Sequence, residues 1–368
     1  MFSLNNKISI RQMQALLVLD IFGAGIVMLP RKAAKYAGQD AWLAIAAATA
    51  AAVLSVYLMT SAGRLYPRDS FVNLVSGLLS KPVGKFVGVL LSAKLLFNCA
   101  IELRLFGEIL RQTMLPATPF AVVCAAMIAI SAYAASKGYE TRARIAQILF
   151  PLIFVPFTFL FVLGLFDVDL SNLLPVFATK PDKLLTGAIH AGTAFSGLEL
   201  IMIAAPFAVR PYAVRRGMIQ AVVFIGIFMI FITSVTIAKF GPGEVTRQLW
   251  PILDMMDLID LPGAFIERQE ALIMSFWIIS NFAIVNSGLF FSSVLLKDVT
   301  GKGSHSLYIL MCMPVVFAGS CFMLDVDQAD HIIELVFYTL GIGFMIILPA
   351  VLLAAAALRK AGDARGKS

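Results

Sequence analysis

Charged residues are scarce in this chain of 368 residues, at 14% of the total, whereas a soluble domain carries about 25%. In their place the sequence is 60% hydrophobic, with a mean hydropathy of +0.89. This composition excludes a soluble globular domain and predicts a chain that crosses a membrane several times. The excess of Lys and Arg, 29 against 22 acidic residues, does not indicate a nucleic-acid partner, because positive charge collects in the cytoplasmic loops of membrane proteins.

Cysteine and histidine are also rare, and neither has the spacing of a metal site. The cysteines Cys99, Cys124, Cys312 and Cys321 all lie in apolar segments, where we expect buried thiols rather than a disulfide framework. No pair of histidines has zinc-type spacing. The sequence contains no glycine-rich phosphate loop, and no Ser/His/Asp arrangement can be argued. We therefore expect no enzyme, no metal site and no cofactor.

Long apolar segments take the place of these features. About 20 apolar residues cross a bilayer, so the sequence predicts an all-α integral membrane protein with ten transmembrane helices. These lie near 12–30, 41–63, 84–113, 117–136, 144–166, 184–208, 216–239, 268–296, 305–323 and 332–357. They form one domain, residues 1–360, followed by a basic cytoplasmic tail, residues 361–368. Lys and Arg are about twice as frequent in the loops on the side of the termini, so both termini are expected to be cytoplasmic.

Two of the predicted helices are interrupted. Gly23 and Gly25 break the first helix within 20–30, and the segment 193–199 breaks the sixth. Unpaired backbone in hydrocarbon costs several kcal/mol, so broken helices survive only where they line a protected cavity. Each break lies in the first helix of a set of five. Because five is an odd number of crossings, the second set starts on the opposite side of the membrane and is inverted relative to the first. The pattern predicts a 5+5 inverted repeat, residues 12–166 and 184–357, with a binding site between the breaks.

The breaks supply the predicted ligand contacts. Unwound backbone exposes N–H groups and the positive end of a half-helix dipole, which suits a carboxylate. We expect this role for Gly23, Ala24, Gly25 and Ile26, and carbonyls around Phe195, Ser196 and Gly197 would take an ammonium group. Glu199 would contact that ammonium, carry a proton or cap freed backbone donors. The alternative is that the glycines only allow close helix packing.

A polar stripe follows one face of the third predicted helix. Lys94, Asn98 and Glu102 are spaced at i, i+4 and i+8, which suits the wall of a cavity. Lys94 could bind an anionic group, and Glu102 could relay protons or neutralise a nearby cation. The alternative for Lys94 and Asn98 is contact with neighbouring helices. Arg104 and Glu108 have the spacing of an ion pair on a helix surface.

The eighth predicted helix and the connection before it lead to two further predictions. Polar side chains follow the eighth predicted helix from Ser280 to Ser293, and we expect Asn286 and Ser287 to adjoin the cavity. The outer connection 241–267 contains Trp250-Pro251 and then Ile252, Met255, Met256 and Ile259, which fall on one helical face. These residues predict a short helix that either lies at the membrane surface, anchored by Trp250, or packs on the bundle.

With these residues in view, the chain resembles the GerB-type (GerAB-like) spore germination permeases of the amino acid–polyamine–organocation superfamily. These are the membrane-embedded B subunits of nutrient germinant receptors. The resemblance runs from about residue 7 to 360. It is carried by Gly23-Ala-Gly-Ile-Val-Met-Leu-Pro30, Asp40-Ala-Trp42, Glu102-Leu-Arg104, Phe195-Ser-Gly-Leu-Glu199, Trp250-Pro251, Phe265-Ile-Glu-Arg268 and Trp277-Ile-Ile279.

The resemblance implies a LeuT-like bundle in the spore inner membrane. It implies that the protein recognises a small germinant, usually an amino acid, and acts with A- and C-type receptor subunits. Two other functions stay open: a proton-coupled amino acid transporter using Glu102 or Glu199, and a membrane scaffold that binds no ligand. A LeuT-like sodium site among the oxygens of the eighth helix is less favoured than ordinary hydrogen bonding between helices.

Overall fold

Residues 7–258, 269–323 and 326–365 are described by the computed structural model of the chain. Apart from one isolated backbone bridge between Ile8 and Ala208, all regular structure in these residues is helical. The predicted all-helical class is therefore confirmed. Ile259 and the motif Phe265-Ile-Glu-Arg268 lie outside the described residues.

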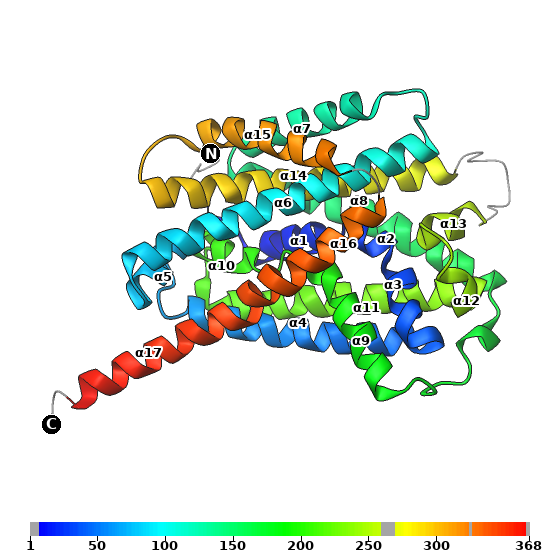
Figure 1. The fold of residues 1–368 in the computed structure, drawn as a ribbon, viewed down its shortest axis with the longest axis horizontal. Helices are drawn as coiled ribbons and strands as arrows, with labels where there is room; N and C mark the ends of the chain where they lie inside the picture. Colours follow the sequence, from blue (N-terminus) through cyan, green and yellow to red (C-terminus); the bar gives the residue numbers. More distant parts are fainter. Residues whose placement is uncertain (1–6, 259–268, 324–325, 366–368) are drawn as a thin grey trace.

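Long helices form the frame of the molecule, and most of them run along its longest axis (Figure 1). They are α4 (Ala41–Gly63), α6 (Lys81–Thr113), α8 (Tyr139–Gly164), α11 (Val214–Phe240), α14 (Gln269–Thr300), α15 (His305–Phe322) and α17 (Leu348–Arg365). Large apolar side chains on their outer faces, such as Phe86 and Ile148, are well exposed. Contiguous apolar surface of this kind is avoided against water and fits contact with lipid.

Shorter elements connect and interrupt this frame. They are α1 (Ile10–Ile21), α2 (Ala24–Val27), α3 (Leu29–Ala37), η1 (Gly38–Asp40), α5 (Phe71–Leu78), α7 (Phe120–Ser136), η2 (Leu165–Asp167), η3 (Leu170–Leu173), α9 (Pro181–Ala191), η4 (Gly192–Phe195), α10 (Leu200–Ala204), η5 (Ala205–Phe207), η6 (Pro211–Ala213), α12 (Pro242–Val245), α13 (Pro251–Asp257), α16 (Val326–Val336), η7 (Phe337–Gly341) and η8 (Gly343–Ile347). The last two, η7 and η8, are π-helical turns.

Among the described residues, eight helical segments are long and apolar enough to cross a membrane. They support a multi-pass membrane protein. Two of the ten predicted spans fall short of this length: the first is divided among α1, α2 and α3, and the fourth is the 17-residue helix α7. The ten-helix layout with its inverted repeat therefore stays a prediction. The segment expected as a tail continues α17 as far as Arg365.

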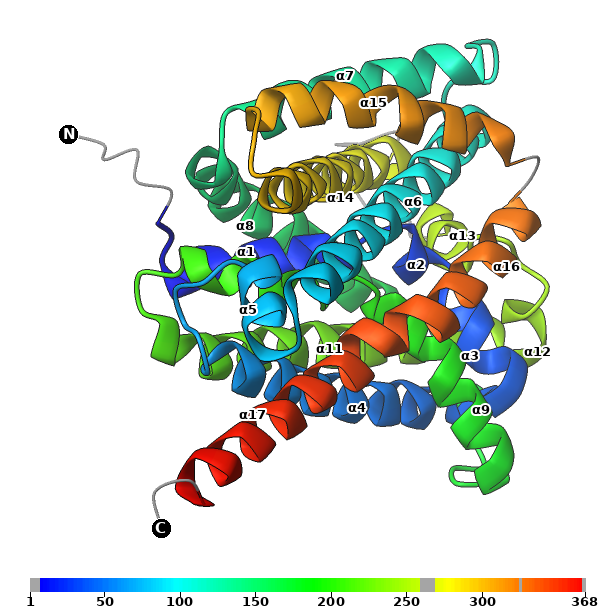
Figure 2. The same cartoon turned by 60° about the vertical axis from the view of Figure 1, so that its left-hand side comes forward.

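Helices of the two halves of the chain pack directly on one another. The pairs α6 and α14, α4 and α11, and α1 and α11 are in contact along their lengths. The helices α7 and α15 lie side by side as an outer layer over α14 and α6 (Figures 1 and 2). No boundary in the described chain separates the first half from the second, so the halves form one packed bundle.

One end of the bundle gathers segments from the whole chain. The Lys7 ammonium donates to the Pro206 carbonyl (3.0 Å), beside the Ile8–Ala208 bridge. The Arg64 guanidinium donates to the Tyr212 carbonyl (3.1 Å), and Arg359 donates to the Gly77 carbonyl (2.5 Å). The first and last described helices therefore have their outer ends at the same face.

At the opposite end, Asp40 anchors the connection that follows α8. Its two carboxylate oxygens accept hydrogen bonds from the backbone N–H groups of Phe177 and Thr179, both at 2.8 Å. Trp42 meets the Phe177 ring edge-on, with centroids 6.0 Å apart. Two residues of the Asp40-Ala-Trp42 motif are thus used to hold this connection on the bundle.

The short helix predicted after Trp250 is present as α13. Ile252, Met255 and Met256 are buried, and the Trp250 indole N–H donates to the Gln112 side chain (3.2 Å). Of the two alternatives, packing on the bundle is the one that the contacts of α13 with α8, α11 and α14 support. The buried thiols are confirmed for Cys99, Cys124 and Cys312, whereas Cys321 is exposed.

Candidate functional site

The first predicted break is present and is held in place by neighbouring helices. After α1 ends at Ile21, the Gly23 N–H turns back to the Ile21 carbonyl (2.9 Å), and Ile26 N–H donates to the Gly23 carbonyl (3.1 Å). The Ser280 hydroxyl of α14 donates to the carbonyl of Phe22, which the break frees. A freed carbonyl in an apolar interior is thereby satisfied, as a broken membrane helix requires.

Gly23 is required by a close approach. A methyl group on its Cα would lie 2.4 Å from Ile284 Cδ1 and 3.0 Å from both carboxylate oxygens of Glu102. Gly25 differs, because a methyl group there would meet only the Ala194 Cα, at 3.9 Å. The first glycine allows tight packing, while the second opens onto free space.

The second break is also present. The helix α9 passes into the 3-10 turn η4, and the chain turns at Gly197 before α10 begins at Leu200. Gly197 has φ +113°, a region that residues with a Cβ avoid. Its N–H donates to the Glu199 carboxylate (3.2 Å), and its carbonyl accepts from Leu200 N–H (3.0 Å). The left-handed turn and its hydrogen bonds explain why this break falls at Gly197.

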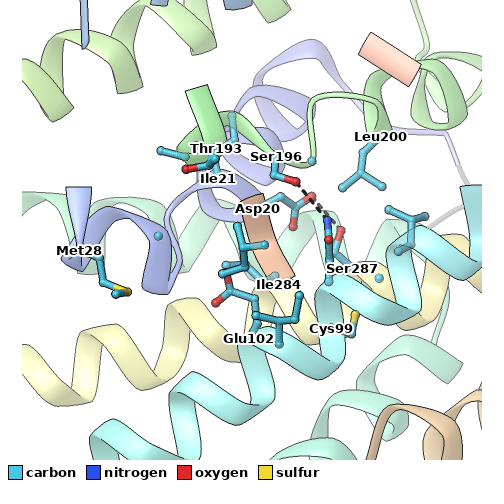
Figure 3. A pocket seen from close by; sticks show the side chains of 18 of the residues that line it. Asp20, Ile21, Met28, Cys99, Glu102, Thr193, Ser196, Leu200, Ile284 and Ser287 are labelled. Carbon is cyan, nitrogen blue, oxygen red and sulfur yellow. Dashed lines mark hydrogen bonds between the residues drawn. The ribbon is translucent and has the colours of Figure 1, made fainter. Parts of the chain in front are cut away.

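A cavity lies between the two breaks (Figure 3). It measures about 70 Å³ as the space open to the centre of a water molecule, below the roughly 300–1,000 Å³ of typical small-molecule sites. As it stands, this cavity admits only the smallest solutes. The wall is built from α1 to α3, α6, the second break, α14 and α16.

Six of the predicted site residues line this cavity: Gly25, Asn98, Glu102, Ser196, Gly197 and Ser287. Gly23 and Ile26 are buried beside it, and their N–H groups are used within the break. Ala24 and Gly25 begin α2, so their N–H groups have no partner within that helical turn. Of these two residues, Gly25 lines the cavity.

The structure puts Lys94 and Glu199 behind the cavity wall rather than in it. Their side chains form an ion pair, and Lys94 also donates to the Ser196 hydroxyl (3.4 Å). The Asn98 amide donates to the same hydroxyl (3.2 Å). Lys94 is therefore already paired with a carboxylate, and Glu199 caps the second break as well as pairing with Lys94.

The remaining predicted residues lie elsewhere. Phe195 faces a separate apolar cavity between α4, α9 and the π-helical turns. The Asn286 amide donates to the Ser131 carbonyl of α7 (2.9 Å), on the side of α14 away from the breaks. The Arg104–Glu108 ion pair is confirmed, with nitrogen and oxygen 3.4 Å apart.

Charged residues that were not predicted as site residues complete the cavity. Asp20 of α1 accepts from Arg142 (2.6 Å) and from the Ser287 hydroxyl (2.8 Å). Lys32 of α3 forms an ion pair with Asp330 of α16, and both line the wall. Asp20 could have been found, because a carboxylate within an apolar span marks a functional or paired position. Arg142, Lys32 and Asp330 lie just outside the spans that the sequence predicts, so hydropathy gives no sign that they form ion pairs within the bundle.

The polar side chains of α14 act as connections between and along helices. Ser287 binds Asp20, Ser292 donates to the Ser92 carbonyl (3.3 Å) and Asn281 donates to the Trp277 carbonyl (3.4 Å). Within the described residues, no group of three or more His, Cys, Asp or Glu side chains could hold a metal ion. Of the two alternatives for this helix, a sodium site and ordinary hydrogen bonding, the contacts of its side chains support hydrogen bonding.

The chemistry of the cavity suits a small polar solute with charges of both signs. Asp20, Glu102, Asp330 and Lys32 line it, together with residues that carry hydroxyl and amide groups; Figure 3 shows Asp20, Glu102 and Ser196 around it. A buried charge or polar group is costly unless it finds a partner. A zwitterion could satisfy both kinds of wall group at once.

Comparison with known proteins gives one family over most of the chain. A family model described as "Spore germination protein" matches residues 7–329. Spore germination protein YndE of Bacillus subtilis is 26% identical over 357 residues, which cover 94% of this chain and 98% of YndE. Spore germination protein B2 is 23% identical over 93% of both chains, and spore germination protein KB is 25% identical over 77% of this chain and 76% of that protein; both are also from B. subtilis.

Proposed function

Because this chain belongs to the spore germination protein family, we propose that it is the membrane subunit of a nutrient germinant receptor in the spore inner membrane. The subunit binds a small germinant, an amino acid, at the membrane midplane and signals to A- and C-type partner subunits. Both termini face the cytoplasm in this proposal. The observation that carries it is the small, charge-lined cavity between two broken helices.

The proposed binding mode follows from the wall groups. The ligand carboxylate accepts from the N–H groups of Ala24 and Gly25, where α2 begins and its dipole is positive. The ammonium lies near Ser196 and the carboxylates of Asp20 and Glu102. Each carbonyl of the second break keeps a second lone pair after its turn hydrogen bond, so it can accept from the ammonium as well.

Signalling requires that the ligand favour one of two conformations. The cavity wall includes α16, which is tied to α3 through the Lys32–Asp330 ion pair. A ligand between the breaks touches both α2 and the turn before α10, so its binding energy can change how these segments sit relative to α16. Partner subunits would detect that change.

The Gly25 position gives a direct test. A ligand at one hundred times its Kd adds about 2.7 kcal/mol to stability, so we expect one or a few compounds from a panel of amino acids, nucleosides and sugars to raise the melting temperature of the purified chain. Gly25→Leu fills the free space beside Ala194 and should abolish that stabilisation. Gly25→Ala meets nothing closer than 3.9 Å and should keep a substantial part of it.

Other outcomes would favour the rival functions. If no compound stabilises the protein, a scaffold without a ligand becomes the better account. A second candidate, proton-coupled amino acid transport, draws on the Glu102 carboxylate beside Gly23 and on the wall of the cavity. Accumulation of the amino acid in proteoliposomes that contain this chain alone, lost in Glu102→Gln, would favour transport over sensing.

A further inference from the structure

A second, larger cavity lies between α1, α8 and α11. In the same measure as the first cavity it is about 430 Å³, within the range of small-molecule sites. The helix α1 contacts both α8 and α11 along its length, and it lies between them in Figure 2. None of the residues of this cavity lines the cavity between the breaks.

The lining of this second cavity is arranged in layers. The helices α1 and α11 run in the same direction, because Gln14 lies beside Gln220 and Phe22, at the end of α1, lies beside Phe228. The helices α8 and α11 do so too, because Phe150 contacts Phe224 and Phe157 contacts Phe228. Each helix contributes one glutamine and then, one turn further in, one apolar side chain. The glutamines are Gln14, Gln147 and Gln220, and the apolar side chains are Val18, Phe150 and Phe224. Arg11 lies one turn outside Gln14, at the mouth.

The hydrogen bonds of the glutamine side chains indicate which of their groups stay available to a ligand in the cavity. Gln147 accepts from Gln12 (3.1 Å), and Gln220 accepts from Gln14 (3.1 Å). Each therefore uses its side-chain oxygen, and its NH₂ group has no hydrogen bond to another described residue. With the Arg11 guanidinium, the outer layer presents donors and one positive charge. Among the described residues that line the cavity there is no carboxylate.

The position of the mouth relates it to the membrane. It lies at the end of the bundle where Lys7, Arg64 and Arg215 bind carbonyl and hydroxyl groups. Beside the cavity, Ile148 of α8 and Ile227 of α11 expose more than half of their side chains, as lipid-facing residues do. A donor-rich, cationic rim above an apolar floor, next to lipid-facing helix surfaces, matches an amphiphile with an anionic head.

We propose that this cavity binds an anionic phospholipid. The headgroup phosphate is held by Arg11 and by the amides of Gln147 and Gln220, and the first part of an acyl chain packs on Val18, Phe150 and Phe224. Arginine presents two parallel donors to a phosphate, and glutamine amides supply neutral donors that cost little to desolvate. A bound lipid would hold α1, the helix that leads into the first break, against α8 and α11.

The test uses the full chain purified in a neutral detergent. Its thermal midpoint is followed during titration with dioleoylphosphatidylglycerol, dioleoylphosphatidylcholine and inorganic phosphate. The variants are Arg11→Gln, which removes the cation at the mouth, and Arg68→Gln, which removes an exposed arginine of the connection between α4 and α5 that does not line the cavity. A third variant, Ala221→Phe, fills the cavity from its wall.

We expect saturable stabilisation by phosphatidylglycerol, with an apparent Kd that rises about tenfold or more in Arg11→Gln because a charge-assisted contact is lost. The Kd should stay within about twofold of the parent in Arg68→Gln. Equal losses in both arginine variants would overturn the proposal in favour of diffuse surface charge. Equal stabilisation by inorganic phosphate would overturn it in favour of a soluble anion. Full affinity in a folded Ala221→Phe would show that the lipid does not enter the cavity.

Discussion

The Lys94–Glu199 ion pair is almost inaccessible, with side-chain exposures of 0% and 1%. Two charges at bilayer depth persist only because each has the other, together with Ser196 and the Gly197 N–H as further partners. The Asp20–Arg142 pair is buried to a similar degree, with both side chains 5% exposed. Around the cavity, ionic residues thus stabilise the shape of the wall as well as giving it charge.

We expect Glu199→Gln to lower the free energy of unfolding by about 3–5 kcal/mol, because it leaves the Lys94 ammonium buried without its countercharge. The glutamine oxygen can still accept from the Gly197 N–H, so the loss of stability measures the effect of removing the negative charge. The double variant Lys94→Met/Glu199→Gln should recover much of the stability. Thermal unfolding in detergent measures both.

Asp167→Asn provides the matched control. It removes the carboxylate of the Lys239–Asp167 pair, in which Asp167 is 84% exposed, so we expect a change of at most about 1 kcal/mol. Should Glu199→Gln prove as mild as Asp167→Asn, the buried pair would have no structural role, and Glu199 would be free to act on a ligand or a proton.

At the scale of elements, the two breaks are shaped by different causes. Gly23 is forced by the close approach of Ile284 and Glu102, whereas Gly197 is forced by its own positive φ. The sequence predicted that both helices would break, because a glycine in an apolar run is visible without a structure. It could not tell which glycine serves packing and which serves backbone conformation.

Gly197→Ala should therefore destabilise the protein by about 1–3 kcal/mol through backbone strain. A methyl group there has room, since the nearest atom it would meet is the Asp20 carbonyl oxygen at 3.7 Å, so crowding is not the cause. Gly77→Ala in α5, with nothing within 4 Å and a helical backbone, should be neutral or stabilising by up to about 1 kcal/mol. Equal effects of the two substitutions in thermal unfolding would contradict the assignment of strain to Gly197.

The last predicted helix, 332–357, shows what periodicity alone misses. It contains the π-helical turns η7 and η8, and Phe337 of η7 lies close to Gly192 of the second break. A π-turn keeps the apolar composition of an α-helix and changes only its register, so hydropathy gives no sign of it. Such turns are frequent at functional sites, and this pair lies directly behind the break.

At the scale of the whole molecule, the frame could be predicted because hydrocarbon requires long apolar helices. The composition of the cavity wall was harder to foresee. Asn98, Glu102, Ser196 and Ser287 were found from breaks and polar stripes, whereas Lys32 and Asp330 meet only after distant segments pack. Pairings between residues so far apart in the chain leave no local pattern.

Contacts at one end of the bundle lead to a prediction about the membrane topology of the termini. These contacts join Ile8 to Ala208, Arg64 to Tyr212 and Arg359 to Gly77. With ten crossings the two termini lie on one side of the membrane, so single cysteines added at either end, in a Cys321→Ser background, should react with an impermeant maleimide from the same side. Labelling from opposite sides would require an odd number of crossings and would exclude the ten-helix layout.

The contacts of α1 also have a consequence for the order of synthesis. Asp20 of α1 binds Arg142 and Ser287, and Ile8, just before α1, bridges to Ala208; all three partners are made long after α1. The helix α1 must therefore wait in the membrane, with the Asp20 carboxylate in its apolar stretch, until the segments that carry these partners have been made. A product that stops before α14 cannot close the bundle around α1, and we expect the cell to degrade it rather than to retain it in the membrane.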